Sequence, residues 1–363
     1  MTTMHHDIEL PAIGPEERVA TAFPSLFNWE YKTRHDELMR LYEKGKQMQW
    51  NASTDIDWSI DVDPERETVQ DHDVMDAILQ PPQKLDTRAR RRMNHHMNAW
   101  MLSQFMHGEQ GALLATAEIV NTVPWIEAKF YAANQVADEA RHVEVYRRYL
   151  TEKMGLSYAV NPHLRTLLNQ IIGDSRWDMI YLGMQIMVEG LALAAFGLMK
   201  FTQADEPLIQ QITSAVMRDE ARHVAFGVLS LQDLYTKELS STELREREEF
   251  VIEATVLMRD RLLMEEVWDR IGLDPKVWLP WSLSTPFMIG FRQMLFSKIV
   301  PNLKRLGLLT PRVRAKYAEL NILQFESMPD STIDEEVAMP PALATFFARL
   351  VQAGVQLPGV DAN

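Results

Sequence analysis

The pentapeptide DEARH occurs twice in this chain, at residues 138–142 within QVADEARHVEVYRRYL and at residues 219–223 within VMRDEARHVAFGVLSL. The second copy starts 81 residues after the first. Both copies lie in long segments, 125–153 and 207–237, that are predicted to be helices because neither contains a proline beyond its first residue. The same acidic, basic and imidazole pattern on two helices indicates a repeated structural role.

The spacing within the pentapeptide places a carboxylate and an imidazole on one helix face. Residues three apart on a helix are neighbours, so Glu139 and His142 point the same way, and Glu220 and His223 do so on the second helix. Helical bundles hold two metal ions with a Glu-x-x-His from each of two helices and one glutamate from each of two others. The repeat therefore predicts a pseudo-symmetric di-metal centre, against the alternative of two ion-pair motifs on helix surfaces.

The depth of the first glutamate in the bundle identifies its partner. A helix over 86–121 and the helix that carries the first pentapeptide are predicted to form an antiparallel hairpin that turns at Pro124. Glu139 is 15 residues past this proline and Glu109 is 15 residues before it, so both lie about 22 Å from the turn. Glu118 is only 6 residues from the turn, and its 9-residue separation from Glu109 puts it on the opposite face. Glu109 is therefore the predicted partner.

The second hairpin passes the same test. A helix over 176–202 is followed by a turn near 204–205; Glu189 lies 15 residues before Ala204, and Glu220 lies 15 residues after Asp205. A metal centre also explains why an otherwise apolar helix contains a glutamate, since the metal neutralises its charge. The predicted metal ligands are Glu109, Glu139, His142, Glu189, Glu220 and His223.

The remaining polar residues of the pentapeptide form i, i+3 pairs: Asp138 with Arg141, and Asp219 with Arg222. We expect them to orient the ligating imidazoles through hydrogen bonds across helices. The alternative is that they form ion pairs on the helix surface.

The apolar segment 179–199 has two interpretations. Its length suits a membrane span, but Gln185 and Glu189 lie near its middle, where a carboxylate in lipid is costly. A helix that is apolar on all sides also fits the centre of a large helical protein. We therefore expect a buried core helix and no membrane span.

The composition narrows the class of protein. With 363 residues, 46% hydrophobic side chains and no cysteine, the chain can bury a large core but cannot form disulfides or thiolate metal sites. A formal net charge of −14 disfavours binding to nucleic acid, whose phosphates it repels. The N-terminal residues lack the apolar segment of a signal peptide, so a cytoplasmic location is the default expectation.

Helical signals dominate, and no strand-like alternation is sustained. We therefore predict an all-α fold: a four-helix bundle with a di-metal core plus flanking helices. An arm over 1–85 is expected to contain one helix, at 33–49, and to be irregular over 51–75. The other expected units are the bundle over 86–237, additional helices packed on it over 238–327 that begin with a helix at 241–271, and a partly disordered tail over 328–363 with a frayed end.

Four segments resemble motifs of the ferritin-like di-iron carboxylate proteins of the ribonucleotide reductase small-subunit class. That class includes the R2-like ligand-binding oxidases and the bacterial multicomponent monooxygenase hydroxylases. The segments are FMHGEQGAL at 105–113, ADEARHVEVYRRYL at 137–150, IMVEGLALAAF at 186–196 and MRDEARHVAFG at 217–227, and the last two look closest to the R2-like oxidases. The resemblance implies a ferritin-like fold, dioxygen activation at a di-iron or mixed manganese–iron centre, and a homodimer.

Departures from these families separate the subclasses. Tyr146 lies one turn after the first imidazole, where reductase small subunits keep a radical tyrosine, but Glu109 stands where those subunits usually have aspartate. Met184 replaces the tyrosine that the ligand-binding oxidases use in a crosslink, and Leu193 replaces a threonine of the monooxygenase hydroxylases. Val216 occupies the place of an additional histidine in arylamine N-oxygenases, so a seven-ligand site is not expected.

Side chains one turn from the ligands are predicted to line the space beside the metals. They are apolar apart from Tyr146, the predicted catalytic residue, which would donate a hydrogen bond or an electron; the alternative is a core tyrosine with a satisfied hydroxyl. An apolar cavity here would suit an acyl chain, an alkyl group or an aromatic ring. The predicted lining is Phe105, Met106, Ala112, Leu113, Val136, Tyr146, Ile186, Ala192, Leu193, Met217 and Phe226.

These features together predict an O2-dependent non-haem di-iron oxygenase or oxidase that attacks a C–H or N–H bond of a hydrophobic substrate. The cofactors would be two iron ions, although the ligand types also suit a manganese–iron pair. Because the chain has no flavin or nicotinamide fingerprint, electrons are expected from an external donor such as a ferredoxin or reductase. The alternatives are a reductase small-subunit-like radical protein, a non-catalytic ferritin-like iron-binding protein and a scaffold without metal.

Overall fold

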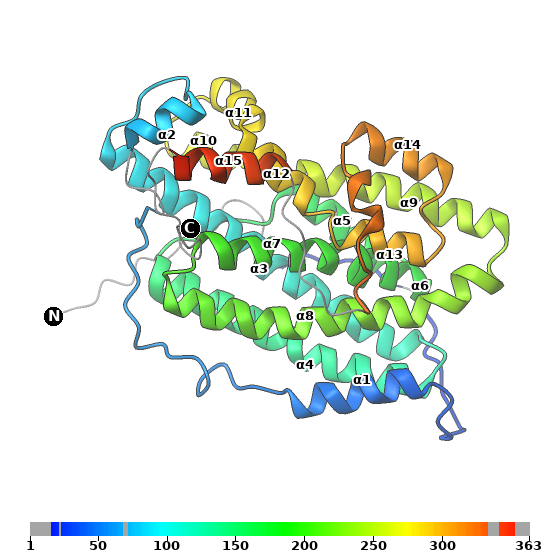
Figure 1. Ribbon diagram of the computed structural model, residues 1–363. Helices are drawn as coiled ribbons and strands as arrows, with labels where there is room; N and C mark the ends of the chain where they lie inside the picture. The colour runs from blue at the N-terminus through cyan, green and yellow to red at the C-terminus, as the bar shows by residue number, and fades with distance from the viewer. Residues whose placement is uncertain (1–15, 22, 68–71, 333–340, 353–363) are drawn as a thin grey trace.

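The computed structural model describes residues 16–21, 23–67, 72–332 and 341–352 (Figure 1). Within these residues all regular secondary structure is helical and there is no strand, which confirms the predicted all-α class. The expectations for the first 15 residues and for the frayed C-terminal end lie outside the described residues.

The first hairpin of the bundle consists of α3 (Thr87–Thr122) and α4 (Ile126–Arg148). The side chain of Asp86 caps α3 by accepting a hydrogen bond from the backbone N–H of Ala89 (2.8 Å). The two helices pack against each other along their length, and the chain turns at Pro124, which cannot continue α3. After α4 the helix widens into the π-helical segment η1 (Tyr149–Met154) and ends at Gly155, whose φ of 61° favours glycine.

The second hairpin begins with one continuous helical run made of α6 (Trp177–Tyr181), the π-helical segment η2 (Leu182–Val188) and α7 (Glu189–Thr202). Glu206 then caps α8 (Pro207–Asp233) by accepting from the backbone N–H groups of Leu208 and Ile209, and η3 (Leu234–Glu238) follows. The run Trp177–Thr202 is apolar and long enough to cross a membrane, but 89% of its apolar window is buried inside the protein. This burial identifies the run as a core helix of the bundle, as expected.

The arm differs from its prediction. It contains α1 (Asp36–Gln47), which packs on α4 and α8, and a second helix, α2 (His72–Leu79). The expectation of a single helix in the arm is therefore wrong. A helix of eight residues is marginal on its own, and α2 packs against α15 (Pro341–Gln352), which is remote in sequence. Its stability thus comes from contacts that the local sequence does not reveal.

The C-terminal helices cover one side and one end of the bundle (Figure 1). The helix predicted at 241–271 is instead broken: α9 (Ser241–Asp260) ends before Met264, which has a φ of 55°, and α10 (Glu265–Arg270) follows. No glycine or proline marks this break. The remaining helices are α5 (Pro162–Gly173), which packs on α3 and α9, α11 (Pro275–Ser284), α12 (Pro286–Met294), α13 (Ile299–Arg305), α14 (Pro311–Glu319) and the short η4 (Leu323–Ser327).

One apolar core runs through the bundle into the C-terminal helices, and a smaller cluster around Trp268 and Trp278 lies where α10 and α11 meet. Close helix packing depends on Gly111 in α3. A Cβ atom at this position would lie 2.5 Å from a methyl carbon of Leu168 in α5. The absence of a side chain at Gly111 therefore sets how closely α5 approaches α3.

Candidate metal centre

The six predicted ligand side chains converge inside the bundle, and each is at most 5% exposed. Their donor atoms fall into two groups, each within 4.8 Å: Glu109, Glu139, His142 and Glu220 form one, and Glu139, Glu189 and His223 form the other. Glu139 belongs to both groups, as a carboxylate that bridges two metal ions would. Glutamates at equal sequence distances from a turn therefore do lie at the same depth in the bundle, as predicted.

Both imidazoles present the same nitrogen to the carboxylates. Nδ1 of His142 lies 3.2 Å from Glu139, 3.1 Å from Glu220 and 3.3 Å from Glu109. Nδ1 of His223 lies 3.1 Å from Glu139 and 3.5 Å from Glu220. The Nδ1 atoms are therefore the ones available to a metal ion.

The other imidazole nitrogens contact the aspartates of the opposite pentapeptide. Nε2 of His142 lies 3.2 Å from Asp219, and Nε2 of His223 lies 3.2 Å from Asp138. Because an ionised carboxylate can only accept, Nε2 carries the hydrogen in each ring and Nδ1 is left for a metal. Arg222 pairs with Asp219, and Arg141 with Asp138, so each aspartate is held in place by its own helix. The hydrogen bonds across helices agree with the prediction.

Three further residues support the site without having been predicted. Gln135 donates to both Glu139 (3.0 Å) and Glu189 (2.9 Å) and so ties the two hairpins together. Gln135 lies one turn before Glu139, and this spacing was the available signal. The indole of Trp50 donates to Asp219 (2.7 Å), and Gln49 donates to Asp138 (2.9 Å). These two follow α1, far from the bundle in sequence.

Burial and mutual repulsion oppose ionisation of two of the carboxyls. Burial, reinforced by the charge of Glu220, raises the pKa of Glu109 to about 8. Burial and the same neighbour raise the pKa of Glu189 well above its ordinary value. In the metal-free protein Glu109 therefore holds a proton at neutral pH, where an exposed carboxyl would not, and the pKa of Glu189 is shifted in the same direction.

At the two imidazoles, the neighbouring carboxylates outweigh burial and favour the charged ring. Burial disfavours the charged ring, but hydrogen bonds to Asp219 and the glutamates raise the pKa of His142 well above 6.5. The charges of Glu139 and Glu220 do the same for the pKa of His223. Burial would raise the pKa of Glu139, yet the charges and hydrogen bonds of the two imidazoles lower it below its ordinary value. Without metal, positive charge at the centre thus comes from bound protons.

The arrangement fits two divalent cations. Two buried carboxylate oxygens, Oε2 of Glu189 and Oε2 of Glu220, have no hydrogen-bond partner within the described chain. Such atoms are costly when left unpaired, and cations at the centre of the cluster would supply their partners. Four carboxylates and two imidazoles in a four-helix bundle are the donor set of the ferritin-like di-metal carboxylate proteins. The helices and the buried donor groups of this chain match that pattern.

Glu118, which the sequence argument set aside, lies outside the cluster. One of its oxygens is buried without a partner in the described chain, and burial raises its pKa to about 7. It therefore carries no ligand role in this arrangement.

Tyr146 lies against the metal centre inside an aromatic layer formed by Phe105, Tyr146 and Phe196. The ring centroids are 6.1 Å apart for Phe105 and Tyr146, 4.7 Å for Phe105 and Phe196, and 6.0 Å for Tyr146 and Phe196. The Tyr146 hydroxyl is buried with no hydrogen-bond partner in the described chain. Burial and the nearby charge of Glu109 raise its pKa.

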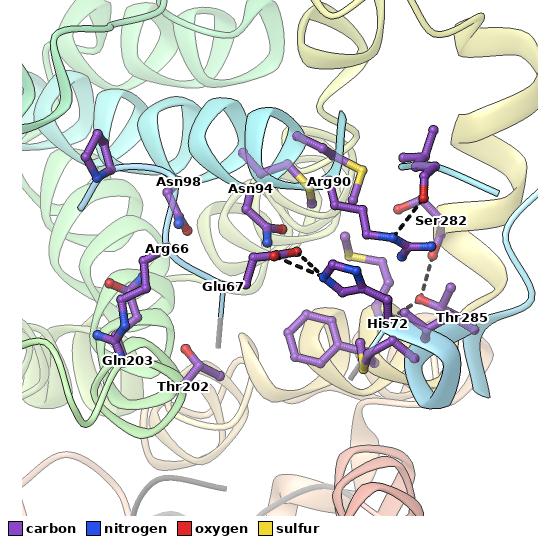
Figure 2. A pocket seen from close by; sticks show the side chains of 18 of the residues that line it. Arg66, Glu67, His72, Arg90, Asn94, Asn98, Thr202, Gln203, Ser282 and Thr285 are labelled. Carbon is purple, nitrogen blue, oxygen red and sulfur yellow. Dashed lines mark hydrogen bonds and ion pairs between the residues drawn. The ribbon is translucent and has the colours of Figure 1, made fainter. Parts of the chain in front are cut away.

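One cavity of the protein lies away from the predicted lining residues. It has a volume of about 370 Å³ and opens at the end of the bundle, where α3 begins and α7 ends (Figure 2). None of the predicted lining residues borders it. Six of them are instead packed in the interior: Phe105, Ala112, Tyr146, Ile186, Leu193 and Phe226. Side chains from the arm and from α11, α12 and α15 form this cavity, and their approach could not be seen in the sequence.

Comparison with known proteins gives structural neighbours only. No protein-family model and no curated protein matches the chain. Three single-residue variants of R2-like ligand-binding oxidase with anaerobically reconstituted Mn/Fe cofactors are similar in structure. They are 18%, 17% and 16% identical, cover 74%, 77% and 81% of this chain and 92%, 95% and 93% of their own, and have TM-scores of 0.45, 0.43 and 0.41. These values are too low to carry an argument about function, which is drawn from the helices and donor groups of this chain.

Proposed function

We propose that this protein is an O2-activating non-haem di-iron oxidase or oxygenase that acts on a C–H or N–H bond of a hydrophobic organic substrate. The observation that carries the proposal is the pair of buried donor groups that share Glu139. When bound there, two iron ions, or one manganese and one iron, would supply redox chemistry with dioxygen. Glu109, Glu139, His142, Glu189, Glu220 and His223 would hold them.

The residues around the centre have separate tasks in this proposal. Asp138 and Asp219 keep each imidazole in the tautomer that offers Nδ1 to the metal. Gln135 holds Glu139 and Glu189 in position by donating to both. The buried aromatic layer excludes water from this side of the centre, which protects a reactive oxidant from unwanted reactions.

Tyr146 is the candidate for moving a proton or an electron. Its hydroxyl hydrogen is not committed to any acceptor in the described chain, and its pKa is raised by burial and by Glu109. The phenol would therefore stay protonated at the centre and would be available as a hydrogen-bond or hydrogen-atom donor. The same observation favours a second candidate, a radical protein like a ribonucleotide reductase small subunit. An external ferredoxin or reductase would supply electrons in either case.

Metal content tests the proposal first. The full-length protein, loaded anaerobically with Fe(II) and desalted, should retain about two metal ions per chain by elemental analysis. The double variant Glu109→Ala, Glu220→Ala should retain none, whereas Glu118→Gln, which removes a buried carboxylate outside the cluster, should retain the full amount. A wild-type protein that stays metal-free would refute the di-metal centre.

Oxygen chemistry then separates the candidates. The loaded, reduced protein should consume O2, and consumption should fall in the double variant. A long-lived tyrosyl signal in electron paramagnetic resonance that is absent from Tyr146→Phe would favour the radical protein. Uptake of many more than two iron ions per chain would favour iron storage, and loaded protein that is inert to O2 would exclude both redox functions.

A further inference from the structure

The cavity at the end of the bundle has the size and lining of a small-molecule site. Its volume of about 370 Å³ lies in the range of ligand pockets. Its walls come from the arm, α2, α3, the turn between α7 and α8, α11, α12 and α15. Apolar and aromatic side chains dominate the lining, among them Met75, Met93, Met97, Phe201, Trp268 and Trp278.

One layer of side chains separates the cavity from the metal centre. Leu102 in the cavity wall lies seven residues before Glu109, and Tyr149 lies seven residues after His142. Seven residues are two helical turns, so these wall residues stand on the same helix faces as the ligands, about 10 Å away along the axes. The aromatic layer of Phe105, Tyr146 and Phe196 fills the intervening turn. The cavity and the metal centre thus lie along the same axis.

The charges of the lining are unfavourable for an anion. Both arginines in the lining are already paired, Arg66 with Asp205 and Arg90 with Asp76. The lining carboxylates outnumber these arginines; they are Asp63, Glu67, Asp76, Asp205 and Glu206. A ligand carboxylate would therefore enter a region of negative charge with no uncommitted guanidinium to receive it.

Asp63, Asp76 and Asp205 pair with arginines, and Glu206 caps α8. Among the described lining carboxylates, Glu67 is the one held by neither an arginine nor a helix N-terminus. It is paired with His72, whose Nε2 lies 3.0 and 3.1 Å from its two oxygens (Figure 2), and its side chain is 11% exposed. Asn94 of α3 points into the same cavity (Figure 2). Because Asn94 precedes Leu102 by eight residues, about 12 Å of helix separates this polar level from the wall nearest the metal centre.

We infer that this cavity binds an organic amine with an apolar body, whose ammonium group pairs with Glu67. The body then lies against the methionines and tryptophans and extends toward the aromatic layer. Tryptophan faces also attract cations, so the lining favours an ammonium over a carboxylate. This inference deepens the proposed function and rests on it, since it names the class of substrate that would approach the metal centre.

Calorimetry with three ligands of equal chain length tests the inference. Titrating n-octylamine, n-octanol and octanoate into the purified full chain at pH 7 should give the tightest binding for the amine, at least tenfold tighter than for octanoate. Glu67→Gln should weaken amine binding about tenfold and leave octanol binding unchanged. Asp63→Asn is the matched control, because it removes the same charge from a lining residue that pairs with Arg91, and it should keep the preference.

The outcomes are distinct. Octanoate binding as tightly as octylamine, no binding by any of the three, or an unchanged amine affinity in a folded Glu67→Gln protein would each overturn the inference. The wild-type ranking decides the matter even if that variant does not fold, as judged by circular dichroism. These titrations need neither metal nor O2, so their failure leaves metal content and O2 consumption unaffected, and a failure of those assays leaves the titrations valid.

Discussion

Metal binding to this protein should release protons, because the buried ligand Glu109 holds one in the metal-free state. A carboxyl with a pKa of about 8, as at Glu109, is about nine-tenths protonated at pH 7. A divalent cation needs the ionised carboxylate, so its binding displaces about 0.9 proton from Glu109 alone. Glu189, His142 and His223 also have pKa values well above their ordinary ones. Protons held by these groups should add to the one released from Glu109 when both metals bind.

The sign of the pH dependence follows from these protons. Below pH 8 the proton on Glu109 competes with the metal, so apparent affinity should rise with pH, about tenfold per unit for each proton displaced. Anaerobic calorimetry of Fe(II) or Mn(II) binding at pH 7, in two buffers of different ionisation enthalpy, counts the protons. Glu109→Gln should lower the count by about one, and Glu118→Gln should leave it unchanged. A wild-type count below about one-half would refute the assigned protonation of the cluster.

Three predictions concern stability. Burial raises the pKa of Glu118 from 4.5 to about 7, so the wild-type protein loses stability as pH rises between these values. At pH 8, Glu118→Gln should therefore be about 1 kcal/mol more stable than the wild type, after a discount for solvent screening. No such gain is expected at pH 4. Equal urea midpoints of the variant and the wild type at pH 8 would contradict this prediction. Gly111→Val should lower the free energy of unfolding by about 2 kcal/mol, because a Cβ atom would lie 2.5 Å from Leu168. A urea midpoint equal to that of the wild type would show that α5 moves away from α3 without cost. Arg247→Met should cost about 3–5 kcal/mol in thermal unfolding. It removes the guanidinium that lies 3.0 and 3.1 Å from the buried Asp178 and leaves only the Tyr235 hydroxyl as its side-chain donor. A loss below 1 kcal/mol would indicate that water replaces the arginine.

The donor cluster could be predicted because helix geometry is nearly invariant. A fixed rise per residue converts equal sequence distances from a turn into equal depth in the bundle. This argument selected Glu109 over Glu118, and the structure places Glu109 in the cluster and Glu118 outside it. Most ends of the hairpin helices were also predicted to within a few residues of their observed positions.

Features that depend on approach between remote segments could not be predicted. Trp50 reaches Asp219 across 169 residues, and no local pattern marks that contact. The cavity draws its walls from the arm and from helices near the C-terminus, and no local pattern shows that these segments meet. The residues one turn from the ligands were predicted to line a space beside the metals, and six of them are packed in the interior. The break at Met264 carries no glycine or proline, which are the residues that usually signal one.

The exchange of aspartates between the two pentapeptides has a consequence for the order of assembly. Asp219 orients His142, and Asp138 orients His223, so neither hairpin contains the complete support for its own imidazole. During synthesis the first hairpin emerges without the aspartate that orients His142, and it gains this aspartate only when α8 docks. A complete metal site must therefore follow the docking of both hairpins, and a half-made chain presents no finished site to a metal ion.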